Sequence, residues 1–142
     1  MIRKKKLQKP SELLNFYSQK LNKGLDEKLS PISFELSFQY RSPHIALISG
    51  YIVFRIGWIL EFDEVIKQER NNIKRLKYRY HVMDKNKELI LRYDNVPHFP
   101  KIKTYPHHKH ANNTVTISQA PDLLDVVDEI EVMIVKESQR DC

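Results

Sequence analysis

The chain has 142 residues, a net charge of +6 with neutral histidines, and a pI of about 9.4. This length favours a single domain, residues 1–142, and the 41% of apolar residues excludes an intrinsically disordered chain. The single cysteine, Cys142, excludes a disulfide framework, and no apolar run is long enough to span a membrane. The basic N-terminal segment lacks the apolar run of a signal peptide, so we expect a cytoplasmic protein. The positive net charge suits an anionic partner.

The first half of the chain changes from helical to strand periodicity. Residues 1–9 form a basic tail that we expect to be flexible, and apolar residues then recur at helical spacing, which predicts a helix within 10–30. We expect Ser11 to cap this helix and Gly24 to end it. From Ile32 the apolar residues alternate with polar ones, which predicts an antiparallel sheet over 31–93. Its four to five strands are expected near 32–40, 47–54, 58–66, 74–83 and 89–93.

The second half is expected to contain a loop and a closing helix. Residues 94–120 are rich in histidine and proline, which predicts a loop rather than a helix or a central strand. Apolar residues spaced as on one helix face predict a C-terminal helix over 121–137. The expected fold class is therefore α+β: a curved antiparallel meander with both helices packed on one face.

Five of the six histidines fall between His81 and His110, and this concentration is the main sign of chemistry. Histidine changes charge near neutral pH and also binds metals. In the strand predicted over 74–83, alternation places four residues on the face opposite the apolar set. A row of three cations and an imidazole would suit a phosphate backbone, although an ordinary solvated strand face has the same pattern. These residues are Arg75, Lys77, Arg79 and His81.

Acid–base cleavage of RNA is the chemistry that these residue types favour. It requires a base for the 2′-OH proton, an acid for the leaving oxygen and cations for the phosphorane charge. We expect His81 with His98 or His108 as the acid–base pair, and two carboxylates, Glu61 and Asp94, to orient them. The expected substrate-binding residues are Arg75, Lys77, Arg79, Arg92 and Lys109. Structural or orienting roles are expected for Asn95, His107 and His110.

Three alternatives stay open from the residues alone. A metal could be bound by Asp94, His98, His108 and His110, but the segment lacks an established zinc-binding spacing, so our principal interpretation includes no metal or other cofactor. The histidines could instead be structural, each hydrogen-bonded to loop backbone. The chain could also be a nucleic-acid- or protein-binding module without catalysis.

The same residues resemble the TumE family, small prokaryotic toxin components of type II toxin–antitoxin systems. The resemblance covers about residues 45 to 131 and departs from the family pattern at Phe99, where a second histidine is usual. It implies growth inhibition, a cognate antitoxin and a ribonuclease-like activity on RNA. We leave open whether the protein forms a homodimer, and we expect no membrane partner. The matching segments are Trp58-Ile59-Leu60-Glu61-Phe62, Tyr78-Arg79-Tyr80-His81, Arg92-Tyr93-Asp94-Asn95-Val96-Pro97-His98, Pro106-His107-His108-Lys109-His110, and Asp125 to Ile130.

Overall fold

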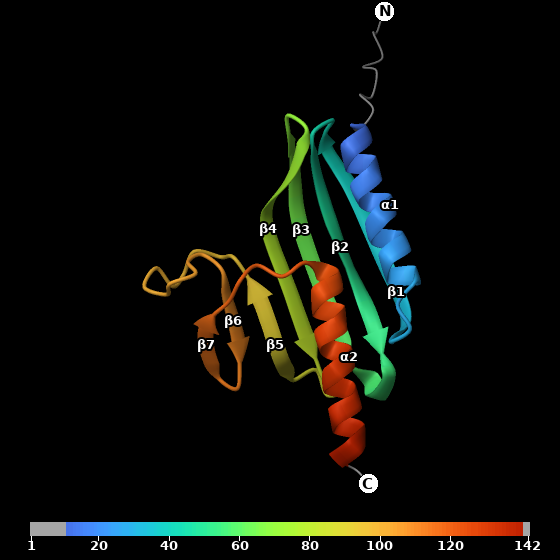
Figure 1. Ribbon diagram of the computed structural model, residues 1–142, viewed down its shortest axis with the longest axis vertical. Helices are drawn as coiled ribbons and strands as arrows, with labels where there is room; N and C mark the ends of the chain where they lie inside the picture. The colour runs from blue at the N-terminus through green and yellow to red at the C-terminus, as the bar shows by residue number, and fades with distance from the viewer. Residues whose placement is uncertain (1–10, 141–142) are drawn as a thin grey trace, which may run out of the picture.

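The fold is one seven-stranded antiparallel meander with a helix at each end of the chain (Figure 1). The computed structural model describes residues 11–140, so the predicted tail over 1–9 and Cys142 lie outside the described residues. The strands pair in chain order from β1 to β7. They are β1 (Pro31–Ser42), β2 (Ile45–Phe54), β3 (Ile59–Glu69), β4 (Asn72–Met83), β5 (Leu89–Asp94), β6 (His108–Ala111) and β7 (Thr114–Ile117).

Helices α1 (Glu12–Asp26) and α2 (Leu123–Arg140) lie on the same face of this sheet (Figure 1). Their apolar sides and the alternate residues of β2 to β5 form one core, in which Leu14, Phe62 and Ile130 are almost fully buried. The expected α+β class, with both helices on one face, is confirmed. The opposite face of the sheet stays open, and it is the face that carries most of the polar residues singled out in the sequence.

Helix α1 begins as expected and ends later. The Ser11 hydroxyl oxygen accepts a hydrogen bond from the Leu14 N–H at 3.2 Å, which is an N-cap contact. The prediction that Gly24 ends the helix is wrong, because the helix continues to Asp26. A Cβ at Gly24 would lie 2.7 Å from Leu124 Cδ1 of α2, so the absent side chain allows the two helices to approach closely.

The loop predicted over 94–120 contains two strands, which is a correction. Strands β6 and β7 form a hairpin whose turn residues, Asn112 and Asn113, have φ values of 52° and 61°. Asparagine tolerates this left-handed conformation better than most residues, and two such residues suit a tight hairpin turn. The hairpin adds His108 and His110 to the edge of the sheet, so these histidines are held by strand pairing rather than by a loop.

One carboxylate is buried beneath the helices. Glu64 of β3 is fully buried and accepts hydrogen bonds from the hydroxyl groups of Tyr17 in α1 and Tyr80 in β4, the latter at 2.7 Å. Burial and the Glu64 carboxylate raise the pKa of both tyrosines, so the hydroxyls stay protonated and can donate. This contact fixes α1 against β3 and β4.

Candidate active site

Two rows of polar side chains cross the open face of the sheet. Residues directly opposite each other in paired strands project from the same face, so the strand register defines each row. The first row runs through Glu61, His81, Arg92 and His110, on β3, β4, β5 and β6. The second runs beside it through Asp63, Arg79, Asp94 and His108. Residues far apart in sequence are thus brought together on the open face.

Asp94 and His108 form a buried pair at one end of the second row. Asp94 is 2% exposed and His108 is 1% exposed. His108 Nε2 lies 2.9 Å from Asp94 Oδ1, and His108 Nδ1 lies 2.9 Å from the carbonyl oxygen of Pro106. A carbonyl oxygen only accepts, so Nδ1 carries a proton; Nε2 also faces an acceptor, so a second proton lies between the imidazole and the carboxylate. The net charge of the Asp94–His108 pair is therefore zero.

Asp94 also holds its other neighbours in place. Its Oδ1 atom accepts the Val96 N–H at 3.0 Å, while Oδ2 lies 3.3 Å from Arg92 Nε and 3.6 Å from His110 Nε2. One buried carboxylate thus orders a guanidinium, two imidazoles and the start of the following loop. Because the shared proton of the Asp94–His108 pair neutralises much of the carboxylate charge, the positive charge of Arg92 remains available to an anion.

His81 and Arg92 each contain a buried nitrogen atom that makes no hydrogen bond, although Arg92 Nε lies 3.3 Å from the Asp94 carboxylate. Four buried side-chain nitrogen or oxygen atoms of residues 11–140 have no hydrogen-bond partner, and two of them are His81 Nδ1 and Arg92 Nε. These residues are direct neighbours across β4 and β5. A buried nitrogen without a partner is unfavourable unless a ligand or water satisfies it. Because both side chains are partly exposed, His81 and Arg92 are adjacent residues of this row that a bound group could reach.

The surroundings of the partly exposed imidazoles of His81 and His110 lower the pKa of each. Burial, followed by Arg92 and Arg79, lowers the pKa of His81, while Glu61 acts in the opposite direction. Burial also lowers the pKa of His110; Asp94 opposes this change, and His108 and Arg92 add to it. A neutral imidazole near pH 7 can accept a proton, which is the state that a general base requires.

The loop after β5 covers one side of the site. The Phe99 ring contacts the rings of His108 and His110 edge-on, with centroids 5.0 and 5.9 Å apart. His98, the preceding residue, is exposed and does not join the cluster of Asp94, His108 and His110. Phe99 therefore screens the imidazoles, and nothing in the sequence pattern had indicated this role.

The residues that could hold a metal ion are Asp94, His108 and His110, whose nearest ligand atoms lie within 4.8 Å of one another. The hydrogen bond from His108 Nδ1 to a backbone carbonyl is typical of metal-ligating histidines. However, a metal would have to replace the proton of the Asp94–His108 pair beside the Arg92 guanidinium, whose charge opposes a cation. A cation at this position would therefore compete with the shared proton and with Arg92.

Arg75 lies on the helix-covered face, so the prediction that it shares a face with Lys77, Arg79 and His81 is wrong. The register of β3 and β4 shifts between Val65 and Ile66, where Ile66 pairs with Arg75 and Val65 with Lys77. This bulge reverses the alternation. Arg75 donates to the Tyr80 hydroxyl and to the Pro121 carbonyl oxygen, both at 2.7 Å.

Lys109 and His107 also project from the helix-covered face. Lys109 Nζ lies 2.9 Å from Glu129 Oε1 of α2 and 5.1 Å from the centre of the Tyr93 ring. His107 Nδ1 lies 2.8 Å from the Tyr78 hydroxyl, and the two rings stack. The side chains of Lys109 and Arg92 leave the sheet on opposite sides, so the fold does not bring these two expected substrate-binding residues together.

The Asn95 side chain makes two hydrogen bonds to the backbone of β4 where β5 no longer pairs with it. Its side-chain oxygen accepts the Tyr78 N–H and its side-chain amide donates to the Leu76 carbonyl oxygen, both at 3.0 Å. These bonds satisfy the backbone of β4 close to the bulge. Asn95 thus fixes the chain where it leaves β5 and enters the loop that carries Val96 and Phe99.

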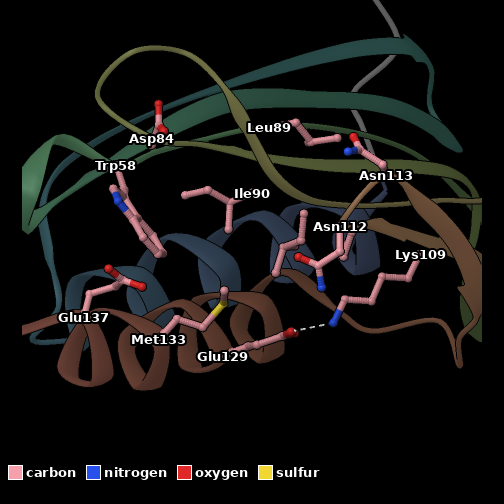
Figure 2. Close-up of a pocket in the computed structure, with 12 residues that line it drawn as sticks. Trp58, Asp84, Leu89, Ile90, Lys109, Asn112, Asn113, Glu129, Met133 and Glu137 are labelled. Atoms are coloured by element: carbon pink, nitrogen blue, oxygen red, sulfur yellow. Dashed lines mark hydrogen bonds and ion pairs between the residues drawn. The ribbon is translucent and has the colours of Figure 1, made fainter. Parts of the chain in front are cut away.

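One cavity of the protein lies away from the histidines. It has a volume of about 640 Å³ and opens on the helix-covered side, between α2 and the β5–β6 edge (Figure 2). Trp58, Ile90 and Met133 are among its apolar lining residues, and the Lys109–Glu129 ion pair lies at one end (Figure 2). It contains none of the histidines, so we place the candidate active site on the open face.

The chain belongs to a family of toxins. A family model described as Toxin TumE matches residues 24–138. Since this match covers most of the chain, the protein belongs to the TumE toxin family, and the resemblance seen in the sequence is confirmed. Comparison with curated proteins and with solved structures found no significant match. Within residues 11–140 no helix combines the length and apolar character needed to cross a membrane.

Proposed function

We propose that this TumE toxin is a metal-independent ribonuclease of a type II toxin–antitoxin system, acting in the cytoplasm. The supporting observation is that His81, Arg92 and His110, which are all partly exposed, occupy neighbouring positions in one row of the open face. A phosphodiester supplies oxygen acceptors for the Arg92 guanidinium, and RNA supplies the adjacent hydroxyl that a base can activate.

In the proposed mechanism, neutral His81 removes the proton of the 2′-OH. The 2′-oxygen attacks the adjacent phosphorus, and Arg92 stabilises the charge that develops on the phosphorane oxygens. Protonated His110, on the other side of Arg92 in the row, gives a proton to the leaving 5′-oxygen. Burial, His108 and Arg92 lower the pKa of His110 and Asp94 opposes this change, so the charge of the bound phosphodiester is needed to favour the protonated form. The products are a 2′,3′-cyclic phosphate and a free 5′-hydroxyl.

This assignment changes the expected partner of His81. His108 had been expected as an acid or base, but it is buried and its two ring nitrogens face Asp94 and the Pro106 carbonyl oxygen. We assign to it the positioning of Asp94. His98 is exposed on the loop, whereas His110 lies two strands from His81 in the same row.

The experiment that tests the proposal compares three single substitutions. His81→Gln and His110→Gln should abolish RNA cleavage by the purified protein and growth inhibition in cells. His44→Gln is the matched control, because His44 is exposed in the turn between β1 and β2, away from the row. Inhibition that survives in both site variants, with a wild-type melting temperature, would contradict the proposal. Binding that weakens steeply with salt, without any product, would instead indicate a non-catalytic RNA-binding module.

The partners of this proposed function are RNA and a cognate antitoxin. Lys77, Arg79 and Arg92 contribute positive charge to the open face, so an acidic segment of an antitoxin could cover the surface that binds RNA. Charge reversal at Lys77, which is exposed, should weaken RNA binding and antitoxin binding together. Loss of RNA binding alone would place the antitoxin elsewhere.

A metal-dependent hydrolase is the second candidate, because Asp94, His108 and His110 converge. Elemental analysis of the purified protein distinguishes it: this candidate requires about one bound transition metal per chain, lost with His110→Gln. The acid–base proposal requires full activity in a metal-free preparation.

A further inference from the structure

A second, smaller cavity lies on the open face beside the candidate active site. Its volume is about 200 Å³, and charged residues of β3 and β4 meet the loop after β5 around it. Asp63 and Arg79 belong to the second polar row, next to Asp94. The residues that line it are Asp63, Lys77, Arg79, Asn95, Val96 and Pro97, together with Tyr78.

The loop wall of this cavity is fixed by hydrogen bonds. Asn95 is held through both side-chain atoms to the backbone of β4, and the Val96 N–H is held by Asp94 Oδ1. The His98 N–H donates to the Val96 carbonyl oxygen at 2.8 Å, which closes a tight turn. The cavity is therefore preformed, and Asp94 connects its wall to the His108 and Arg92 positions.

The polar groups in the cavity offer an acceptor beside donors. The Arg79 Nε–H donates to Asp63 Oδ2 at 2.8 Å, and both side chains are partly exposed. Among the contacts of the described residues, this leaves Asp63 Oδ1 as an acceptor and the terminal guanidinium nitrogens of Arg79 as donors. Lys77 adds three further N–H donors. Val96 and Pro97 supply an apolar wall for the face of a planar ring.

This combination matches a base that presents a ring N–H next to a carbonyl oxygen. Guanine and uracil have that lactam group, whereas neutral adenine and cytosine do not. Asp63 would accept the ring N–H and the cations would donate to the carbonyl. The Asp63–Arg79 positions lie two residues along their strands from Glu61 and His81, about 7 Å at a rise of about 3.3 Å per residue. This separation is within the reach of one nucleoside.

We infer that this cavity, the Asp63 subsite, binds the guanine or uracil base next to the cleaved phosphodiester. The inference rests on the proposed ribonuclease function for its biological meaning. Base binding can nevertheless be measured without any cleavage, so the two proposals can fail separately.

Titration of the wild-type protein with the four nucleoside 3′-monophosphates, followed by NMR chemical shifts, tests the inference. Guanosine and uridine nucleotides should bind roughly tenfold or more tightly than adenosine and cytidine nucleotides. The nucleotide of 1-methylguanosine, which lacks the ring N–H, should bind as weakly as the adenosine nucleotide. Equal affinity for all of these ligands, matched by inorganic phosphate, would overturn the inference.

A matched pair of variants tests the role of the carboxylate. Asp63→Asn should reduce the preference for guanosine and uridine nucleotides to less than about threefold, because the amide can donate to the bases that the carboxylate rejects. Glu69→Gln removes an exposed carboxylate at the far end of the same strand and should leave the preference unchanged. A preference that survives Asp63→Asn would overturn the inference. Cleavage without base preference would overturn only the subsite, and base preference without cleavage would overturn only the ribonuclease proposal.

Discussion

Replacing Asp94 by asparagine should destabilise the fold far more than the same replacement at Asp63. The side chain of Asp94 is 3% exposed and is paired with buried His108, whereas that of Asp63 is 41% exposed and is paired with partly exposed Arg79. Breaking a buried pair by changing one partner costs about 3–5 kcal/mol, and an exposed pair contributes about 0–1 kcal/mol. The asparagine oxygen can still accept the Val96 N–H. We therefore expect about 3 kcal/mol for Asp94→Asn.

The assay is thermal unfolding, checked by urea denaturation. A chain of this length loses about 3 °C in melting temperature per kcal/mol, so Asp94→Asn should melt about 10 °C lower. Asp63→Asn should melt within about 3 °C of wild type. Combining Asp94→Asn with His108→Gln should destabilise less than the sum of the two single changes, because each removes the same interaction. Equal melting temperatures for Asp94→Asn and Asp63→Asn would refute the description of Asp94 as a buried, proton-sharing centre.

Four further outcomes follow from the structure. RNA cleavage should persist below pH 6.5, where an ordinary histidine protonates, because burial and nearby guanidinium groups lower the pKa of His81; an acid limb above that pH in the rate profile would contradict its role as base. Exhaustive dialysis against EDTA should leave the cleavage rate unchanged, and a loss restored by zinc would favour the metal-dependent candidate. Tyr17→Phe should lower the urea unfolding free energy by about 1.5–3 kcal/mol, since it removes a hydrogen bond to buried Glu64; an unchanged midpoint would argue against that contact. Gly50→Ala should lower the free energy of unfolding by about 3 kcal/mol or more, because the added Cβ would lie 2.1 Å from the Glu35 carbonyl oxygen. A melting temperature equal to that of the wild type would mean that β1 can shift to relieve this contact.

Periodicity predicted the architecture because long strands and helices carry it clearly. The alternation over 58–66 and 74–83 placed β3 and β4 close to their observed bounds, and the Ser11 cap located the start of α1. The hairpin of β6 and β7 was missed because each strand has only four residues. Two adjacent asparagines at 112 and 113 were the available signal for its turn.

The composition of the candidate site was predictable, but the side of the sheet on which each residue lies was only partly so. Strict alternation placed Arg79 and His81 correctly relative to each other, yet it failed at Arg75 because a bulge has no clear signature in this sequence. Burial of His108 depends on the Pro106 carbonyl oxygen and the Asp94 carboxylate, which are contacts of tertiary structure. The screening role of Phe99 likewise depends on how the loop folds back.

The hairpin of β6 and β7 forms the last and shortest part of the sheet, and it carries two imidazoles of the candidate site. Short edge strands open more readily than a core, and β7 at the edge contains no buried residue. Detachment of this hairpin would withdraw His108 and His110 while β1 to β5 and both helices kept their shared core. Under the proposed mechanism, RNA cleavage would then be lost before global unfolding, so the hairpin, rather than the core, would set the temperature range of activity.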